Sequence, residues 1–240
     1  MIASKLTPLL AGSMIAQLGV LPGGAATAQP DLASVVNKMQ AVAERQRSNL
    51  CGYSVTRTYT LQNKHLKPNA QMQVRLTYQM GKGKHFQILS IQASGVARKS
   101  LTDLLQAELK TDKGQQEDNA IDTSNYKFTF IGEDDCESRK CHKLGLKPRR
   151  KTTYLVDGTA WVSVADDAVV RITGRLAKSP SFWIARPEVE QRFEKVDGFW
   201  LPSYNHSSTQ VFFAGEADLT IEYSSYRVQA CSNLGRERER

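Results

Sequence analysis

Residues 53–80 decide the fold: they begin YSVTRTYTL (53–61) and end MQVRLTYQM (72–80). In each segment one set of alternate positions carries most of the large side chains, and the other carries only Ser, Thr, Gln and Arg. A period of two is typical of a strand with one buried face. The stretch therefore predicts two long neighbouring strands, joined by a polar loop at residues 63–69.

The strand pattern continues on both sides of an interrupting helix. A third strand is expected around Phe86, Ile88 and Ile91, and residues 125–228 are mostly strand and turn. Turn signals divide that second part: Asp157-Gly158 between 153–156 and 160–164, Asp197-Gly198 between 189–196 and 199–204, and residues 214–216 between 209–213 and 217–228. Short connections of this kind predict an antiparallel meander.

Two amphipathic helices are expected beside these strands. Asp31 is a suitable N-cap for residues 32–47, where Leu32, Val35, Val36 and Met39 follow helical spacing. Residues 96–110 carry a second apolar stripe, formed by Leu101, Leu104, Leu105 and Leu109. An antiparallel sheet needs one covered face, and these helices can cover it. The predicted fold class is α+β, mainly β.

Residues 1–28 have the features of a cleavable signal peptide. Lys5 precedes a mostly apolar stretch at 6–21, and Ala26-Thr27-Ala28 fits the small-x-small cleavage pattern. Pro8 and Gly12 are among the residues that interrupt the stretch, so a transmembrane anchor is disfavoured. We expect a signal peptide at 1–28, a single domain at 29–232 and a charged disordered tail at 233–240. Residue 29 is Gln rather than Cys, so the cleavage point offers no lipid-attachment site.

Four cysteines support export to an oxidising compartment. Cys51, Cys136, Cys141 and Cys231 allow three pairings. Cys136–Cys141, a short loop clip, and Cys51–Cys231, which would join the first strand to the last, are favoured. A metal site at Cys141 and His142 is disfavoured because neighbouring strand residues point to opposite faces.

The chain contains no recognisable catalytic motif. Glycine-rich nucleotide loops and nucleophile elbows are absent, and the four histidines are scattered. The sequence therefore predicts a protein that is not an enzyme and needs no cofactor or metal. Its formal net charge of +8 suits anionic surfaces or simple solubility. The basic run at 147–151 is either a headgroup contact or, preferably, a solvated strand entrance, and nucleic acid is disfavoured.

Aromatic residues gather in the predicted strands and in the segment 182–200. One interpretation is that they line the concave side of a curved sheet, where a pocket would suit acyl chains. The other is an ordinary core between sheet and helices. The candidate lining residues are Tyr53, Val55, Arg57, Tyr59, Leu76, Tyr78, Phe128, Phe130, Trp161, Phe182, Trp183, Phe193 and Trp200.

The order of these elements resembles the LolA/LolB-like superfamily of periplasmic lipoprotein carriers. The likeness is strongest over residues 126–226, at LKPRRK (146–151), DGTAWV (157–162), VRITG (170–174), KSPSFW (178–183), GFWLP (198–202) and ADLTIEY (217–223). The resemblance implies a half-barrel, in which a strongly curved antiparallel sheet wraps around a few helices over a hydrophobic cavity. It also makes Arg57 the candidate for the arginine that gates the cavity in the carriers.

Two functions follow as expectations. The first is a soluble periplasmic protein that binds a lipid or lipoprotein acyl chain for envelope transport, without catalytic residues or cofactor. The alternative is a non-catalytic interaction or sensing module with a filled core, bound to an envelope protein. Neither requires nucleic acid or a transmembrane segment in the mature chain.

Overall fold

A computed structural model describes residues 30–63, 66–93, 95–111, 119–182, 184–212 and 215–231. Every element described below belongs to one compact unit, which begins at Asp31. The expected signal peptide at 1–28, the tail at 233–240 and Trp183 lie outside the described residues.

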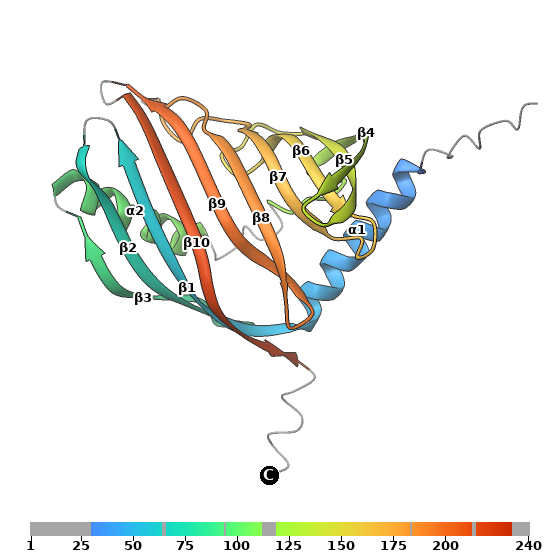
Figure 1. Cartoon of the computed structure of the whole chain (residues 1–240), viewed down its shortest axis with the longest axis horizontal. Helices are drawn as coiled ribbons and strands as arrows, with labels where there is room; N and C mark the ends of the chain where they lie inside the picture. Colours follow the sequence, from blue (N-terminus) through green and yellow to red (C-terminus); the bar gives the residue numbers. More distant parts are fainter. Residues whose placement is uncertain are drawn as a thin grey trace, which may run out of the picture. The chain divides into compact units, whose positions relative to one another are not determined.

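The described residues form one ten-stranded antiparallel sheet with two open edges, in the order β3-β2-β1-β10-β9-β8-β7-β6-β5-β4 (Figure 1). The strands are β1 (Leu50–Asn63), β2 (Leu66–Gln79), β3 (Gly83–Gln92), β4 (Tyr126–Cys136), β5 (Arg139–Pro148), β6 (Val156–Ser163), β7 (Val169–Leu176), β8 (Glu188–Val196), β9 (Phe199–Val211) and β10 (Gly215–Ala230). This confirms the predicted fold class.

The first and last strands meet inside the sheet. The β1–β2–β3 meander and the β4-to-β10 meander are joined by the pairing of β1 with β10, from Leu50↔Ala230 to Asn63↔Ala217. A disulfide between Cys51 and Cys231, with Cα atoms 4.8 Å apart, joins the start of β1 to the residue after β10. Cys136 pairs with Cys141 across the β4–β5 hairpin. Both pairings are those favoured from the sequence.

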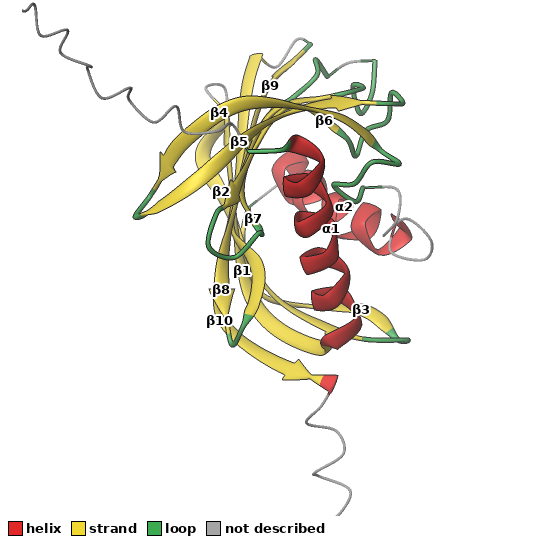
Figure 2. Ribbon diagram, turned by 90° about the vertical axis from the view of Figure 1, so that its right-hand side faces the viewer, coloured by secondary structure: helices red, strands yellow, loops and turns green. Residues whose placement is uncertain are grey.

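Both helices lie on the same side of the sheet, which curves around them (Figure 2). Helix α1 (Leu32–Asn49) begins at Asp31, whose carboxylate accepts hydrogen bonds from the Ala33 and Ser34 N–H groups. Helix α2 (Gly95–Thr111) connects one edge strand, β3, to the other, β4. No helix in the described ranges has the length and hydropathy needed to cross a membrane.

Each helix packs on a different part of the sheet. Val35, Val36 and Met39 of α1 form a buried cluster with Leu144 of β5 and Val162 of β6. Towards the β3 edge of the same face, α2 contributes to a second cluster, whose buried members are Tyr59, Ala70, Met72, Val74, Leu101 and Leu105. The sequence placed both helices correctly to within two residues.

One turn expected from the sequence is wrong. Asp157-Gly158 lies inside β6, where Gly158 is directly opposite Gly174 of β7. A Cβ atom added to Gly158 would lie 2.0 Å from the Thr173 carbonyl oxygen, so a residue without a side chain is needed where β6 and β7 approach each other closely. The expected division of residues 199–213 into two strands is also wrong, because β9 is continuous. Asp197-Gly198 does form the β8–β9 turn, with φ of 49° and 87°.

Candidate functional site

The candidate site is the face of β1 and β2 that α2 covers. In the β1–β2 register, Tyr53 is opposite Tyr78, Val55 opposite Leu76, and Tyr59 opposite Met72. Strand alternation puts these residues on the same face as Arg57, which is opposite Val74. Six expected lining residues therefore share this face: Tyr53, Val55, Arg57, Tyr59, Leu76 and Tyr78. Their arrangement follows directly from the alternation at 53–61 and 72–80.

Arg57 is a buried charge in this apolar layer. Its guanidinium Nη1 donates to both carboxylate oxygens of Glu108 on α2, at 3.1 and 2.9 Å, and approaches the Tyr59 hydroxyl at 3.3 Å. Its Cζ lies 5.1 Å from the ring centroid of Tyr223 and 5.7 Å from that of Phe86. The side chain is 8% exposed, whereas that of Glu108 is 31% exposed. The pair thus joins the sheet to α2 through one polar contact inside a hydrophobic cluster.

The surroundings keep Arg57 charged. Burial works to lower the pKa of the guanidinium, but Tyr223, Glu108 and Tyr59 together raise it above its ordinary value. Burial also raises the pKa of the Tyr59 hydroxyl to about 12, although Arg57 beside it acts in the opposite direction. The Nζ of Lys84 on β3 lies 3.3 Å from Oε1 of Glu108, so this carboxylate contacts two cations.

Tyrosine rings line one end of the same face. The rings of Tyr53 and Tyr78 are 5.4 Å apart, and those of Tyr53 and Tyr226 are 6.0 Å apart. The Tyr226 hydroxyl donates to the Pro202 carbonyl oxygen at 2.7 Å, and burial raises the pKa of this hydroxyl. These contacts extend the aromatic surface from β2 across β1 to β10. Tyr223 and Tyr226 were not among the expected lining residues, although Tyr223 is part of the ADLTIEY segment (217–223).

Three other expected residues lie beneath or beside α1. Phe128 and Phe130 of β4 pack against the α1 cluster, and Phe193 of β8 packs against the neighbouring cluster around Tyr126 and Leu146. They share the helix-covered side of the sheet with Arg57, but Phe128 and Phe130 lie on the opposite edge strand, β4, and Phe193 lies on β8 in the middle of the strand order. The helix-covered surface therefore has two aromatic regions, one under each helix.

Trp161 and Trp200 belong to a different cluster. Trp161 packs with Cys136, Cys141 and Val170, and Trp200 packs against that group. On β6, Trp161 alternates with Ala160 and Val162, which belong to the helix-side clusters, so its ring lies on the opposite face. Phe182, in the β7–β8 loop, is 91% exposed. This corrects the expectation that all the aromatic residues share one surface.

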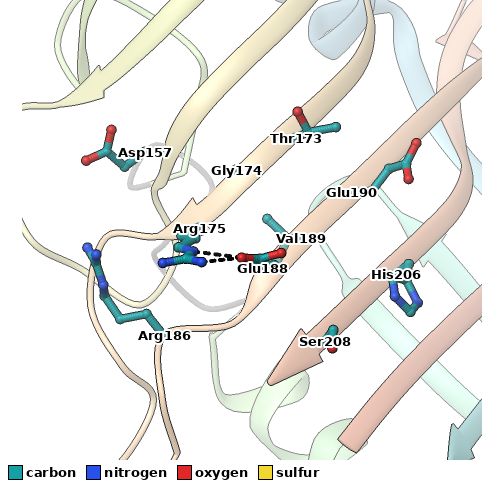
Figure 3. A pocket seen from close by; sticks show the side chains of 10 residues that line it. All are labelled: Asp157, Thr173, Gly174, Arg175, Arg186, Glu188, Val189, Glu190, His206 and Ser208. Carbon is teal, nitrogen blue, oxygen red and sulfur yellow. Dashed lines mark hydrogen bonds and ion pairs between the residues drawn. The ribbon is translucent and has the colours of Figure 1, made fainter. Parts of the chain in front are cut away.

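One described pocket is polar, and no helix residue lines it. Its volume is about 520 Å³, and its walls come from β6, β7, β8 and β9 and from Arg186 in the loop before β8 (Figure 3). Arg175 and Glu188 form an ion pair across it, with Glu190, His206 and Ser208 nearby. Charged walls of this kind do not suit an acyl chain.

The described residues contain no group of three or more His, Cys, Asp or Glu side chains that could hold a metal ion. The basic run at 147–151 is partly used in local structure: Lys147 pairs with Asp157, the Arg149 Nε donates to the Tyr126 carbonyl oxygen, and Arg150 donates to Asn125. The preferred interpretation of this run as a strand entrance fits these contacts.

A LolA superfamily protein is among the solved structures that the chain matches. That structure, from Nitrosomonas europaea, is 11% identical, with 84% of this chain and 94% of that chain covered and a TM-score of 0.38. An outer membrane lipoprotein-sorting protein domain from Vibrio parahaemolyticus is 10% identical, with 81% and 93% covered and a TM-score of 0.43. A DUF1329 family protein from Desulfovibrio piger is 11% identical, with 84% and 94% covered and a TM-score of 0.42.

No family model matches the chain, and no curated protein matches it significantly. The architecture itself rests on the strand order and on the two helices packed against one face of the sheet.

Proposed function

We propose that this protein binds an acyl chain of a lipid or lipoprotein between α2 and the sheet, as a carrier in the cell envelope. The observation that carries the proposal is the ion pair of Arg57 and Glu108 inside the apolar layer. A ligand would displace α2 and occupy the surface formed by Tyr59, Met72 and Val74.

The physical argument concerns what holds α2 in place. A buried ion pair gains little net stability, because desolvation of both charges offsets their attraction, whereas apolar residues of similar volume bind more strongly. Arg57 and Glu108 therefore allow α2 to leave the sheet at a lower cost than a fully apolar contact would. Binding of an acyl chain offsets the free energy needed to displace α2, since each buried methylene contributes about 0.8 kcal/mol.

Export supports the same proposal. The leader pattern at residues 1–28 and the two disulfides suit an oxidising compartment, where acyl chains of envelope lipids need a protein to cross water. Expression of the full chain in a bacterium, followed by fractionation and intact-mass measurement, tests the compartment. The expected product begins at Gln29 and is found in the periplasm.

A second candidate function is a protein-interaction module with a filled core. Leu101 and Leu105 of α2 are 0% and 4% exposed, so in this conformation they occupy the surface that a ligand would use. If α2 never leaves, the fold serves as a scaffold for an envelope protein. The two functions differ in whether α2 moves.

The experiment is photo-crosslinking with a diazirine-labelled fatty acid, followed by peptide mapping. We expect labels on β1, β2 and α2, and we expect weaker labelling in the double variant Arg57→Met/Glu108→Leu, whose apolar contact holds α2 more firmly. Asp103→Asn is the matched control, because Asp103 forms an exposed ion pair with Lys99 on the same helix. Equal labelling of the double variant and wild type, or labels confined to the outer face, would overturn the proposal.

A further inference from the structure

Two phenylalanine side chains are strongly exposed at one end of the sheet. Phe182, in the loop between β7 and β8, is 91% exposed, and Phe212, directly after β9, is 63% exposed. Large aromatic side chains are costly to hold in water, since burying one fully contributes roughly 1.5–3 kcal/mol. Exposure of two such side chains on neighbouring segments marks an interaction surface.

The backbone holds these two segments together. Ile184 forms a β-bridge with Val211, and the Ala185 N–H donates to the Gln210 carbonyl oxygen at 2.9 Å. The Thr209 hydroxyl donates to the Ala185 carbonyl oxygen, also at 2.9 Å. Within the loop, the Ile184 N–H donates to the Ser181 carbonyl oxygen at 3.3 Å, so Phe182 lies in a turn. Phe182 and Phe212 therefore project from two segments fixed to each other.

Exposed cations flank the Phe182 ring along the chain. Lys178 and Arg186 lie on either side of Phe182 in the same loop, and both are exposed. Arg186 forms no ion pair with any residue that the structure describes, whereas the nearby Arg175 is bound to Glu188 (Figure 3). We call Phe182, Phe212, Lys178 and Arg186 the aromatic tip.

We infer that the aromatic tip docks the protein on the surface of an anionic lipid bilayer. Aromatic side chains favour the boundary between headgroups and acyl chains, where an apolar ring is buried without crossing the membrane. Lys and Arg beside such rings gain from the negative potential of the lipid surface. Two exposed rings on paired segments, one of them between two exposed cations of its loop, match both requirements, and the formal net charge of +8 has the same sign.

This docking is separate from acyl-chain binding. The aromatic tip lies where β8 begins and β9 ends, and its residues take no part in the α2 cluster. The inference therefore stands or falls independently of the proposed function. A protein that binds no acyl chain would still dock, and a carrier with an altered tip would still bind acyl chains in solution.

Vesicle flotation with the full mature chain tests the inference. The probes are phosphatidylethanolamine/phosphatidylglycerol vesicles and, for comparison, neutral phosphatidylcholine vesicles. We expect binding to the anionic vesicles, weakened about tenfold by each of Phe182→Ser and Phe212→Ser. Arg186→Gln should weaken binding to anionic vesicles about fivefold and leave the neutral vesicles unaffected.

Controls come from another part of the same sheet. Ile131→Ser removes an apolar side chain that is 54% exposed on edge strand β4, and Lys140→Gln removes an exposed cation on β5. Both variants should float like wild type, and Phe212→Trp should retain binding. Equal flotation of the Phe182→Ser/Phe212→Ser variant and wild type would overturn the inference. So would self-association in sedimentation that the double variant abolishes, because the tip would then contact a second copy.

Discussion

Arg57 shows how one residue can be both buried and charged. Its guanidinium donates to Glu108 and lies against the rings of Tyr223 and Phe86, so its hydration is replaced by one carboxylate and two π-faces. The Arg57 Nε is nevertheless buried without a hydrogen-bond partner among the described residues. The hydrogen-bonding capacity of Arg57 is therefore not fully used, and loss of one further partner should lower the stability of the fold markedly.

Substitution of Glu108 by Gln should expose this dependence. The change removes the carboxylate and leaves the Arg57 charge buried without a counter-ion, at an expected cost of about 2 kcal/mol in the free energy of unfolding. The value is below that of a fully buried pair because Glu108 is 31% exposed. Urea unfolding measures it. Asp103→Asn should change stability by less than about 0.5 kcal/mol, and an equal loss in both variants would contradict the argument.

At the scale of elements, the strands and helices were largely predictable, but the face of the sheet on which each aromatic side chain lies was not always predictable. Alternation at 53–61 and 72–80 predicts β1 and β2, because large side chains follow one face of each strand and, apart from Arg57, these are apolar or aromatic. In contrast, Trp161 was assigned to the wrong face. Both Ala160 and Trp161 are buried on β6, one towards the helices and one against the Cys136–Cys141 disulfide, so apolarity does not distinguish the two sides.

The residues whose roles could not be predicted from the sequence make contacts with residues far away in the chain. Glu108 is an ordinary polar residue in a predicted helix, and nothing near it in the sequence indicates that Arg57 will be its partner. Gly158 follows an Asp, which is a typical hairpin signal, but its position is determined by Gly174 on the next strand. Pairing between elements, rather than local preference, decides both residues.

The two disulfides should differ in their effect on stability, because they close loops of very different length. Cys51–Cys231 spans 180 residues and joins β1 to the end of β10, so its removal should lower the free energy of unfolding by about 5 kcal/mol in the chain-entropy description. Cys136–Cys141 spans only 5 residues, and its removal should cost about 2 kcal/mol.

Paired Cys→Ser variants under identical oxidising conditions test this order. Thermal unfolding of the Cys51→Ser/Cys231→Ser variant should occur well below that of Cys136→Ser/Cys141→Ser. After full reduction neither variant contains a disulfide. If the Cys51→Ser/Cys231→Ser variant then still unfolds well below the Cys136→Ser/Cys141→Ser variant, loop closure is not the cause of the difference.

At the scale of the whole described unit, the two helices are attached differently. Helix α1 has an N-cap at Asp31, and the side-chain oxygens of Gln40 and Gln46 accept hydrogen bonds from the Thr123 and Trp200 N–H groups at 2.7 and 2.8 Å. Helix α2 is held by its leucine stripe and by Glu108, and it follows the edge strand β3, which is paired on one side only. The carrier proposal requires this asymmetry, since one helix must stay while the other leaves.

Amide hydrogen exchange should therefore show α2 opening before the rest of the sheet. Because α2 follows an edge strand and is attached through an ion pair that adds little net stability, we expect its buried amides to exchange about tenfold faster than those of α1, which corresponds to ~1.4 kcal/mol less protection. The variant Arg57→Met/Glu108→Leu should slow exchange in α2 and leave α1 unchanged, because it replaces the ion pair with an apolar contact. If α2 and α1 instead exchange only through global unfolding, with the same protection in both proteins, then α2 is a fixed part of the core. The interaction-module function would then be the better description of this fold.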